Sequence, residues 1–364
     1  MTSDRTIHTV TSPISGVPSN DRHRAASSRD LSVDTLRGLA CILLVTYHVI
    51  GDKASAGIHV DDDSVLRYYS DSVEYLRMPL FTFLSGLVYS WRPLSALQDY
   101  PSFMTKKARR LLVPYVIFVP ILGATQLVAP GVNGTVDPNP LLWWINSLSP
   151  YWFLLSTFWL FALVALLDSY GVLRSPWFFG GLFTVSVTIS LLFRPETLET
   201  LQLGTALTFL PFFLAGIAAF RFRLIPRRVS TAILTTVVLV ALLVTVQFAL
   251  LGNLDHIDAR HSVIGIALGI VFPTAFLGWG LRSRLLAWIG GYSSGIYLLH
   301  SFAIGFFRAV LSAIGIDNTA IVFTVLSLCG VFASILGIVI LRQITIGPWA
   351  IGRIMLGEKA PHGS

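Results

Sequence analysis

Long apolar runs separated by short connections dominate this chain. A helix that crosses the hydrocarbon core of a bilayer needs about 20 mostly apolar residues, and ten runs approach that length. They span residues 31–50, 73–91, 111–128, 152–167, 177–193, 206–220, 231–251, 262–280, 285–308 and 320–341. The pattern predicts an all-α, polytopic integral membrane protein with about ten transmembrane helices and no separate soluble domain.

The lysines and arginines indicate how the runs cross the membrane. With a cytoplasmic N-terminus, 20 of the 26 lysines and arginines fall on the cytoplasmic side, as the positive-inside rule expects. Acidic residues lean the other way, for example Asp61, Asp62 and Asp63 in the first outer connection. Because an even number of spans fits this alternation, we expect both termini to be cytoplasmic.

The same pattern divides the chain into three segments. Residues 1–30 are rich in Ser, Thr, Arg and Pro and lack an apolar stretch. This composition predicts a disordered cytoplasmic tail rather than a cleavable signal peptide. Residues 31–341 form the predicted ten-helix domain, and residues 342–364 form a cytoplasmic C-terminal tail.

Composition narrows the class of partner. The chain is 54% hydrophobic and 12% charged, with a mean hydropathy of +0.71, whereas soluble domains carry about 25% charged residues. A net charge of +7 would suggest nucleic acid for a soluble protein, but here topology explains the cations. We therefore expect a lipid bilayer and no nucleic acid. Cys41 and Cys329 lie in separate runs and predict no disulfide framework, and no cluster has the spacing of metal ligands.

The first run carries three ionisable residues, Asp34, Arg37 and His48. Such groups cost about 2.5–3.5 kcal/mol each near the centre of a membrane, so they are functional candidates. Arg37 and His48 are separated by roughly 16 Å along a helix and project from nearly the same face. Asp34 lies one turn before Arg37 and can pair with it. The alternatives are a snorkelling anchor for Arg37 and a packing histidine for His48.

Five motifs occur in order across residues 31–341. They are Asp34-x-Leu36-Arg37-Gly38 followed by His48, residues 78–86 (MPLFTFLSG), residues 107–115 (KARRLLVPY), residues 151–154 (YWFL) and residues 290–300 (GGYSSGIYLLH). Together they resemble the signature motifs of the membrane acyltransferase-3 family. The Met-Pro-Leu-Phe version of the second motif looks closest to the fucose 4-O-acetylase-like branch. Many members of that branch carry His directly before it, where this chain has Arg77.

The resemblance implies a membrane O-acyltransferase of the bacterial inner membrane. Its usual reaction moves acetyl from cytoplasmic acetyl-CoA to a hydroxyl of an envelope carbohydrate, such as an exopolysaccharide, a lipid-linked oligosaccharide or a glycolipid. Acetyl-CoA is then a substrate, and no bound cofactor is expected. The residues predicted to hold acyl-CoA are Arg37, Lys106, Lys107, Arg109 and Arg110, because guanidinium and ammonium groups bind phosphates. A plain topological anchor is the alternative for the cluster at 106–110.

His48 is the predicted catalytic residue, supported by Arg37 and Asp34. It can act as a general base for the acceptor hydroxyl or carry the acetyl group as a nucleophile. The predicted acceptor residues are Glu74, Arg77, Trp152, Tyr297 and His300. Each has a structural alternative: a Glu74–Arg77 pair, a hydrogen-bonding role for His300, and an interfacial aromatic belt containing Trp152 with Tyr151, Trp143 and Trp144.

Other functions and roles remain open at this point. A transporter or flippase would also place Arg37 and His48 along a translocation path, although the chain has no internal repeat of the kind many transporters show. An acetyl carrier subunit and a longer donor such as succinyl-CoA are further alternatives. The second basic cluster, Arg221, Arg223, Arg227 and Arg228, is expected to set topology, and Ser85 beside Gly86 to allow close helix packing.

Overall fold

The computed structural model describes residues 30–128, 137–194, 200–255, 257–346 and 349–359. Within these ranges every regular secondary-structure element is a helix, apart from one isolated β-bridge between Ile346 and Trp349. The all-α prediction is therefore confirmed. The predicted disordered tail falls on residues 1–29, which lie outside the described residues, as does the end of the C-terminal tail.

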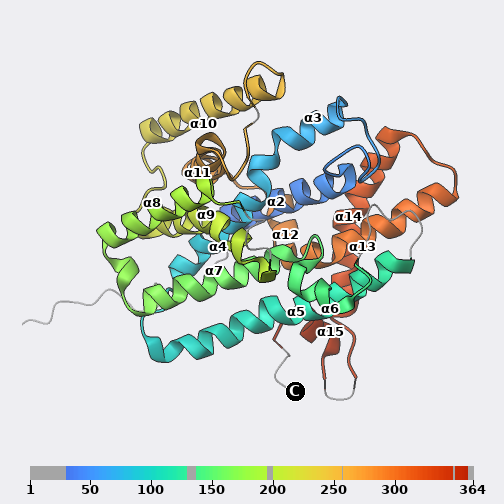
Figure 1. The fold of residues 1–364 in the computed structure, drawn as a ribbon, viewed down its shortest axis with the longest axis horizontal. Coiled ribbons are helices and arrows are strands. Elements are labelled where there is room, and N and C mark those ends of the chain that lie inside the picture. The colour runs from blue at the N-terminus through green and yellow to red at the C-terminus, as the bar shows by residue number, and fades with distance from the viewer. Residues whose placement is uncertain (1–29, 129–136, 195–199, 256, 347–348, 360–364) are drawn as a thin grey trace, which may run out of the picture. The chain divides into compact units, whose positions relative to one another are not determined.

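The helices follow the predicted runs closely (Figure 1). The longer ones are α2 (Leu31–Ile50), α3 (Val65–Ser72), α4 (Arg77–Trp91), α5 (Tyr100–Val128), α7 (Trp152–Ser169), α8 (Pro176–Leu192), α9 (Leu203–Arg221), α10 (Val229–Leu250), α11 (Val263–Gly278), α12 (Arg284–Gly290), α13 (Ser293–Ala313) and α14 (Thr319–Leu341). Short elements include η1 (Glu74–Leu76), α6 (Pro140–Leu142) and α15 (Ile351–Met355).

Seven of these helices, α2, α5, α7, α9, α10, α13 and α14, are long and apolar enough to cross a bilayer. Helices α8 and α11 are apolar but shorter, and α4 has 15 residues. The chain is thus a multi-pass helical membrane protein. The count of ten spans and the side of each terminus stay predictions.

Two predicted runs have different boundaries in the structure. The ninth run is broken, because α12 ends at Gly290 and α13 begins at Ser293. Helix α12 packs so closely on α2 that a Cβ at Gly38 would lie 1.9 Å from the Leu286 carbonyl oxygen. The third run starts earlier than expected, since α5 begins at Tyr100. The basic cluster at 106–110 is therefore part of a long helix and does not precede it.

Glycines also bring α4 and α9 together. A Cβ at Gly86 would lie 1.9 Å from the Phe213 carbonyl oxygen, and a Cβ at Gly216 would lie 2.0 Å from that of Phe83. The Ser85 hydroxyl donates to the Phe81 carbonyl 2.8 Å away in its own helix. The predicted packing role of this Ser-Gly pair is confirmed. Such small residues let helix backbones approach inside a membrane.

A buried ion pair fastens the C-terminal end of α9 to α7. Arg221 donates to both carboxylate oxygens of Asp168, at 3.0 and 2.7 Å, and to the Leu173 carbonyl at 2.9 Å. The Tyr89 hydroxyl adds a bond of 3.0 Å to Asp168, which is 1% exposed. Arg221 thus has a structural role, whereas Arg223, Arg227 and Arg228 remain exposed.

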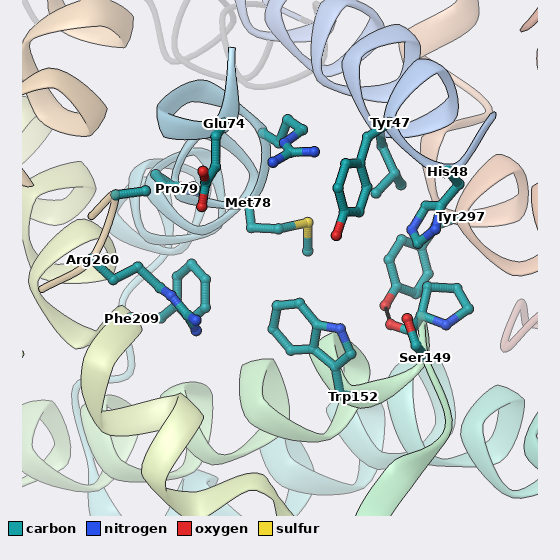
Figure 2. A pocket seen from close by; sticks show the side chains of 14 residues that line it. Tyr47, His48, Glu74, Met78, Pro79, Ser149, Trp152, Phe209, Arg260 and Tyr297 are labelled. Carbon is teal, nitrogen blue, oxygen red and sulfur yellow. Dashed lines mark hydrogen bonds between the residues drawn. The ribbon is translucent and has the colours of Figure 1, made fainter. Parts of the chain in front are cut away.

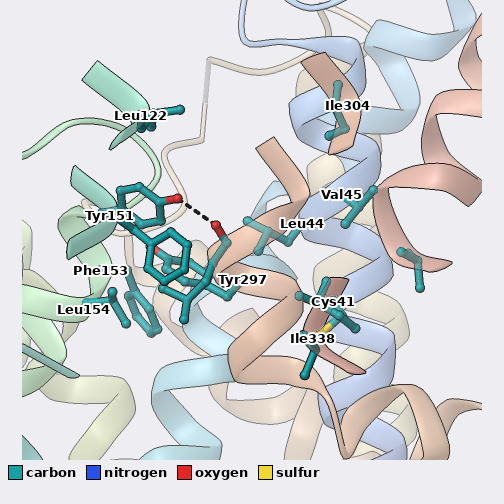
Figure 3. Packing of buried hydrophobic residues seen from close by; sticks show 14 of the residues in the cluster. Cys41, Leu44, Val45, Leu122, Tyr151, Phe153, Leu154, Tyr297, Ile304 and Ile338 are labelled. Carbon is teal, nitrogen blue, oxygen red and sulfur yellow. Dashed lines mark hydrogen bonds between the residues drawn. The ribbon is translucent and has the colours of Figure 1, made fainter. Parts of the chain in front are cut away.

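Helix α2 lies at the centre of this packing and contacts α4, α12, α13 and α14. Cys41, Leu44 and Val45 of α2 belong to a large apolar cluster that also contains Ile304 and Ile338 (Figure 3). Both cysteines are free, as predicted. Because α2 is held on several sides, its polar residues are carried by a helix that is largely buried inside the protein.

Candidate functional site

A polar pocket lies beside the C-terminal end of α2 (Figure 2). It encloses about 690 Å³ of empty space, part of which is open to solvent. Its polar and aromatic lining includes Tyr47 and His48 from α2, Glu74 and Arg77 near the start of α4, Trp152 at the start of α7, Arg260 from the loop before α11, and Tyr297 from α13. Five of the predicted site residues therefore meet in one cavity.

His48 stands in this pocket with His300 behind it. The two imidazole centroids are 4.9 Å apart. His300 is fully buried and its Nδ1 lies 3.0 Å from the Ile296 carbonyl oxygen and 2.9 Å from that of Tyr297. Since carbonyls only accept, Nδ1 of His300 carries a proton. His300 itself does not line the pocket, so its position fits support of His48 better than contact with an acceptor.

The ring nitrogens of His48 are available, because they have no hydrogen-bond partner in the part of the chain that the structure describes. Among the described residues, none forms a hydrogen bond with its imidazole. The contacts of the ring are aromatic, with Tyr47 at 5.0 Å and His300 at 4.9 Å between centroids. An imidazole that lines a pocket with both nitrogens available can accept a proton from a bound hydroxyl or attack a carbonyl carbon.

Arg77 and Glu74 do not form the ion pair that their spacing allows. The Arg77 guanidinium carbon lies 3.7 Å from the centroid of the Tyr47 ring instead. Arg77 is 8% exposed, and its Nη1 has no hydrogen-bond partner among the described residues. The side chain of Glu74 stays on the pocket wall. The cation–π contact thus holds Arg77 in place and leaves donor groups for a bound molecule.

The aromatic residues of the fourth run divide between pocket and core. Trp152 lines the pocket and stacks on Phe209, with centroids 5.8 Å apart. Tyr151 is fully buried and donates to the Leu298 carbonyl at 2.6 Å (Figure 3). The Tyr297 hydroxyl donates to the Pro150 carbonyl. These two bonds fasten the loop before α7 to α13 and so fix one wall of the pocket.

The interpretation of Trp143 as part of an interfacial belt is wrong. Trp143 is 5% exposed, its indole covers Gly123, and its Nε1 donates to the Asp137 carbonyl at 2.7 Å. A Trp-Trp pair after a loop resembles an interfacial anchor in sequence, but here the short helix η3 (Trp143–Ser147) packs on α5. Trp144 likewise donates to the Val116 carbonyl of α5, at 3.2 Å.

Sequence reasoning missed Tyr47 and Arg260. Tyr47 is adjacent to His48, so the neighbour of a candidate base was the available signal. Arg260 lies in a predicted outer connection with no motif around it. The Asp258 carboxylate shapes this loop by accepting from the backbone amides of Arg260 and His261, at 2.7 and 2.9 Å. Burial raises the pKa of Asp258, but these two bonds and the nearby side chains of His261 and Arg260 together outweigh it, so the net pKa lies below its ordinary value.

The other end of α2 carries the remaining predicted residues. Asp34 and Arg37 form the expected ion pair, at 2.9 Å, far along the helix from His48. On α5, Lys106, Arg109 and Arg110 are exposed. The Nζ of Lys107 lies 3.4 Å from the centroid of the Phe161 ring on α7. The residues predicted for acyl-CoA therefore lie outside the pocket, and one of them already packs against an aromatic face.

These features define a class: a multi-pass helical membrane protein whose central helix carries an available imidazole in a polar cavity. A family model described as an acyltransferase domain, that of acyltransferase family 3, matches residues 30–342. The chain belongs to this family. Searches of curated proteins and of solved structures found no significant match. Family membership favours the enzyme over the transporter or flippase and makes the chain a membrane acyltransferase.

Proposed function

We propose that this acyltransferase moves acetyl from cytoplasmic acetyl-CoA to a hydroxyl of a carbohydrate on the opposite side of the bacterial inner membrane, with His48 as the central catalytic residue. The observation that carries this proposal is the unpartnered imidazole of His48 in a pocket with a carboxylate, two guanidinium groups and an indole. Sites for small ligands are typically lined by apolar and aromatic side chains with a few convergent polar groups, and the lining of this pocket has that composition.

The chemistry needs one proton acceptor and one stabiliser of negative charge. As a base, His48 removes the proton of the acceptor hydroxyl while the oxygen attacks the thioester carbonyl. The tetrahedral oxyanion then expels the CoA thiolate, which takes up the proton from the His48 imidazolium and so regenerates the neutral base. Arg77, which is itself buried, supplies N–H groups that can face the developing oxyanion. An acetyl-imidazole intermediate is the two-step version, and the same position of His48 serves either route.

The remaining pocket groups suit a sugar acceptor. An indole such as that of Trp152 offers a flat apolar face to a sugar ring, and the Glu74 carboxylate accepts hydrogen bonds from hydroxyls. Arg77 and Arg260 donate hydrogen bonds to ring, hydroxyl or carboxylate oxygens. We extend the resemblance to the fucose 4-O-acetylase-like branch as part of the proposal, with Arg77 taking the place of the histidine of that branch.

The donor side of the proposal rests on the opposite end of α2. Arg37, Lys106, Arg109 and Arg110 would bind the phosphates of coenzyme A. Roughly 16 Å of helix then separate Arg37 from His48. The arm of acetyl-CoA that links its phosphates to the thioester has to cover this distance along α2. Lys107 contributes less than its neighbours, because its ammonium lies over Phe161.

A comparison of surface glycans tests this function. Cells expressing the wild type should carry an acetyl mark, seen as a mass increase of their glycans, that cells expressing His48→Ala lack. Ser85→Ala is the matched control, because its hydroxyl bonds only to its own helix. Protein levels are equalised by immunoblot. An acetyl mark that persists in His48→Ala would contradict the assignment, and a succinyl mark would replace the donor without changing the role of His48.

Acetyl-CoA binding tests the donor site separately. Arg109→Ala combined with Arg110→Ala should weaken binding of acetyl-CoA to the purified protein by tenfold or more, since each charge-assisted bond contributes about 1.5–3 kcal/mol. Lys107→Met is the control and should change binding by less than the double variant. Equal binding by the wild type and the double variant would return this cluster to a topological role.

A further inference from the structure

Four helices enclose a second, apolar cavity that is separate from the His48 pocket. Helix α8 packs on α9, α10 packs on α11, and α9 contacts α11. All four helices contribute residues to the cavity wall, and they are neighbours in Figure 1. The cavity between them encloses about 1020 Å³ of empty space. Its walls include Phe179 and Phe183 of α8, Ala218 of α9 and Ile270 of α11. It shares no lining residue with the polar pocket.

The cavity offers almost nothing to a polar ligand. Besides the aromatic and aliphatic side chains, its wall contains two threonines, Thr235 and Thr274. Each hydroxyl is already bonded within its own helix, Thr235 to the Thr231 carbonyl at 2.8 Å and Thr274 to the Ile270 carbonyl at 2.7 Å. A sugar or a nucleotide would therefore lose hydrogen bonds on entering, whereas a hydrocarbon chain would lose none.

Cations gather at one end of this cavity. Its wall includes Phe222 and Leu224, and Arg223 lies between them in the chain. Arg227 and Arg228 follow, immediately before α10. These three arginines are exposed, and none takes part in a salt bridge or hydrogen bond of its side chain with the described residues. Arg221 differs, because Asp168 neutralises it.

Two helices begin at the same end and add to its positive character. Helix α8 starts at Pro176, after Ser175, and α10 starts after Arg228, and neither N-terminus has a side-chain cap. The first N–H groups of a helix carry partial positive charge and bind anions when no side chain satisfies them. Beside the arginines, they favour a phosphate over any neutral head group.

We propose that this cavity binds an anionic phospholipid of the surrounding bilayer. An acyl chain occupies the apolar space between α8 and α10, and the phosphate of the head group lies at Arg223, Arg227 and Arg228. Basic clusters beside cavities between membrane helices recognise phosphate head groups in this way. The apolar cavity and the charge at its end thus complement the two halves of one molecule.

The bound lipid would stabilise α10, which is the least buried of the seven helices long enough to cross a bilayer. Helix α10 packs mainly on α11 and α3, and only 6% of its apolar window is buried inside the protein. A lipid between α10 and α8 adds a contact that the protein itself does not supply. Because ligands stabilise the state that binds them, the melting temperature should rise with anionic lipid.

Native mass spectrometry of the full-length protein tests the proposal, with phosphatidylglycerol and phosphatidylcholine of identical acyl chains as probes. We expect the wild type to retain phosphatidylglycerol several-fold better than phosphatidylcholine. The variant Arg223→Gln/Arg227→Gln/Arg228→Gln should lose that preference and bind both lipids alike. These substitutions are on the surface and leave the packed core unchanged.

A pair of glycine variants tests the cavity itself. Gly180 lines it and Gly181 does not, yet a Cβ at either position meets open space. Gly180→Leu should fill the cavity and lower retention of phosphatidylglycerol several-fold, while Gly181→Leu keeps the wild-type value. Equal retention of the two lipids by the wild type would overturn the proposal, as would equal loss in the two glycine variants. The thermal shift with phosphatidylglycerol should follow the same order.

Discussion

Arg77 combines two properties that are difficult to reconcile with a purely structural role. Its guanidinium group is nine-tenths buried and lies on the Tyr47 ring, yet one of its nitrogens has no hydrogen-bond partner among the described residues. A buried donor without a partner costs about 1–3 kcal/mol, and more when the group is charged. Such a cost is typical of a group that binds a ligand or takes part in a reaction, because functional sites often lower the stability of the folded protein.

Replacing Arg77 should therefore separate activity from stability. Arg77→Met removes the unsatisfied charge while keeping most of the apolar side chain. We expect acetyl transfer to fall by tenfold or more, while the melting temperature of the purified protein stays the same or rises. A lower melting temperature with normal specific activity would instead mean that the cation–π contact serves to hold α4 against α2.

Some residues of the pocket could be predicted from the sequence and others could not. His48, Glu74, Arg77 and Trp152 were found because an ionisable or aromatic residue near the end of an apolar run is conspicuous. Tyr297 was found through the motif that it shares with His300. Arg260 was missed because its place in the pocket depends on how its own loop folds against residues such as Arg77, which comes 183 positions earlier in the chain. The direction of Lys107 was equally hidden, since helical periodicity does not tell which neighbour a long side chain will cover.

At the scale of the elements, close backbone contacts and one buried ion pair define the bundle. Sequence located most of the longer helices because they coincide with apolar runs, but it missed α3, which lies in the connection between the first two runs. It did not locate the break between α12 and α13, because residues 285–308 read as one apolar run, and the glycines and serines at 290–295 do not show by themselves that a helix ends there. That break places α12 against α2, and the contact depends on a partner more than 240 residues away.

The Asp168–Arg221 pair gives a prediction at this scale. Removing one member of a buried pair leaves the other charge uncompensated and costs about 3–5 kcal/mol. Asp168→Leu alone should lower the melting temperature clearly, and Asp168→Leu with Arg221→Leu should recover much of the loss. Thermal unfolding in detergent measures both. A double variant as unstable as the single one would mean that Tyr89 and the Leu173 carbonyl, rather than charge balance, determine the stability of this joint.

For the molecule as a whole, the central proposal requires the two ends of α2 to face opposite sides of the membrane. Lys53 follows α2 directly and Ser95 follows α4, and both are exposed. In intact cells, a cysteine at Lys53 should react with a membrane-impermeant maleimide and a cysteine at Ser95 should not. Native Cys41 and Cys329 lie within α2 and α14 and should stay unlabelled. The reverse pattern would place His48 on the cytoplasmic side and contradict the proposed route.

Acetyl transfer in sealed membrane vesicles tests the account most directly. Inside-out vesicles from expressing cells expose the cytoplasmic face, so added radiolabelled acetyl-CoA should label glycan inside the vesicles. We expect label with the wild type and with Ser85→Ala, a loss of at least a hundredfold with His48→Ala, and no label in right-side-out vesicles. Equal labelling of His48→Ala vesicles, or labelling that does not depend on vesicle orientation, would contradict transfer by His48 across the membrane.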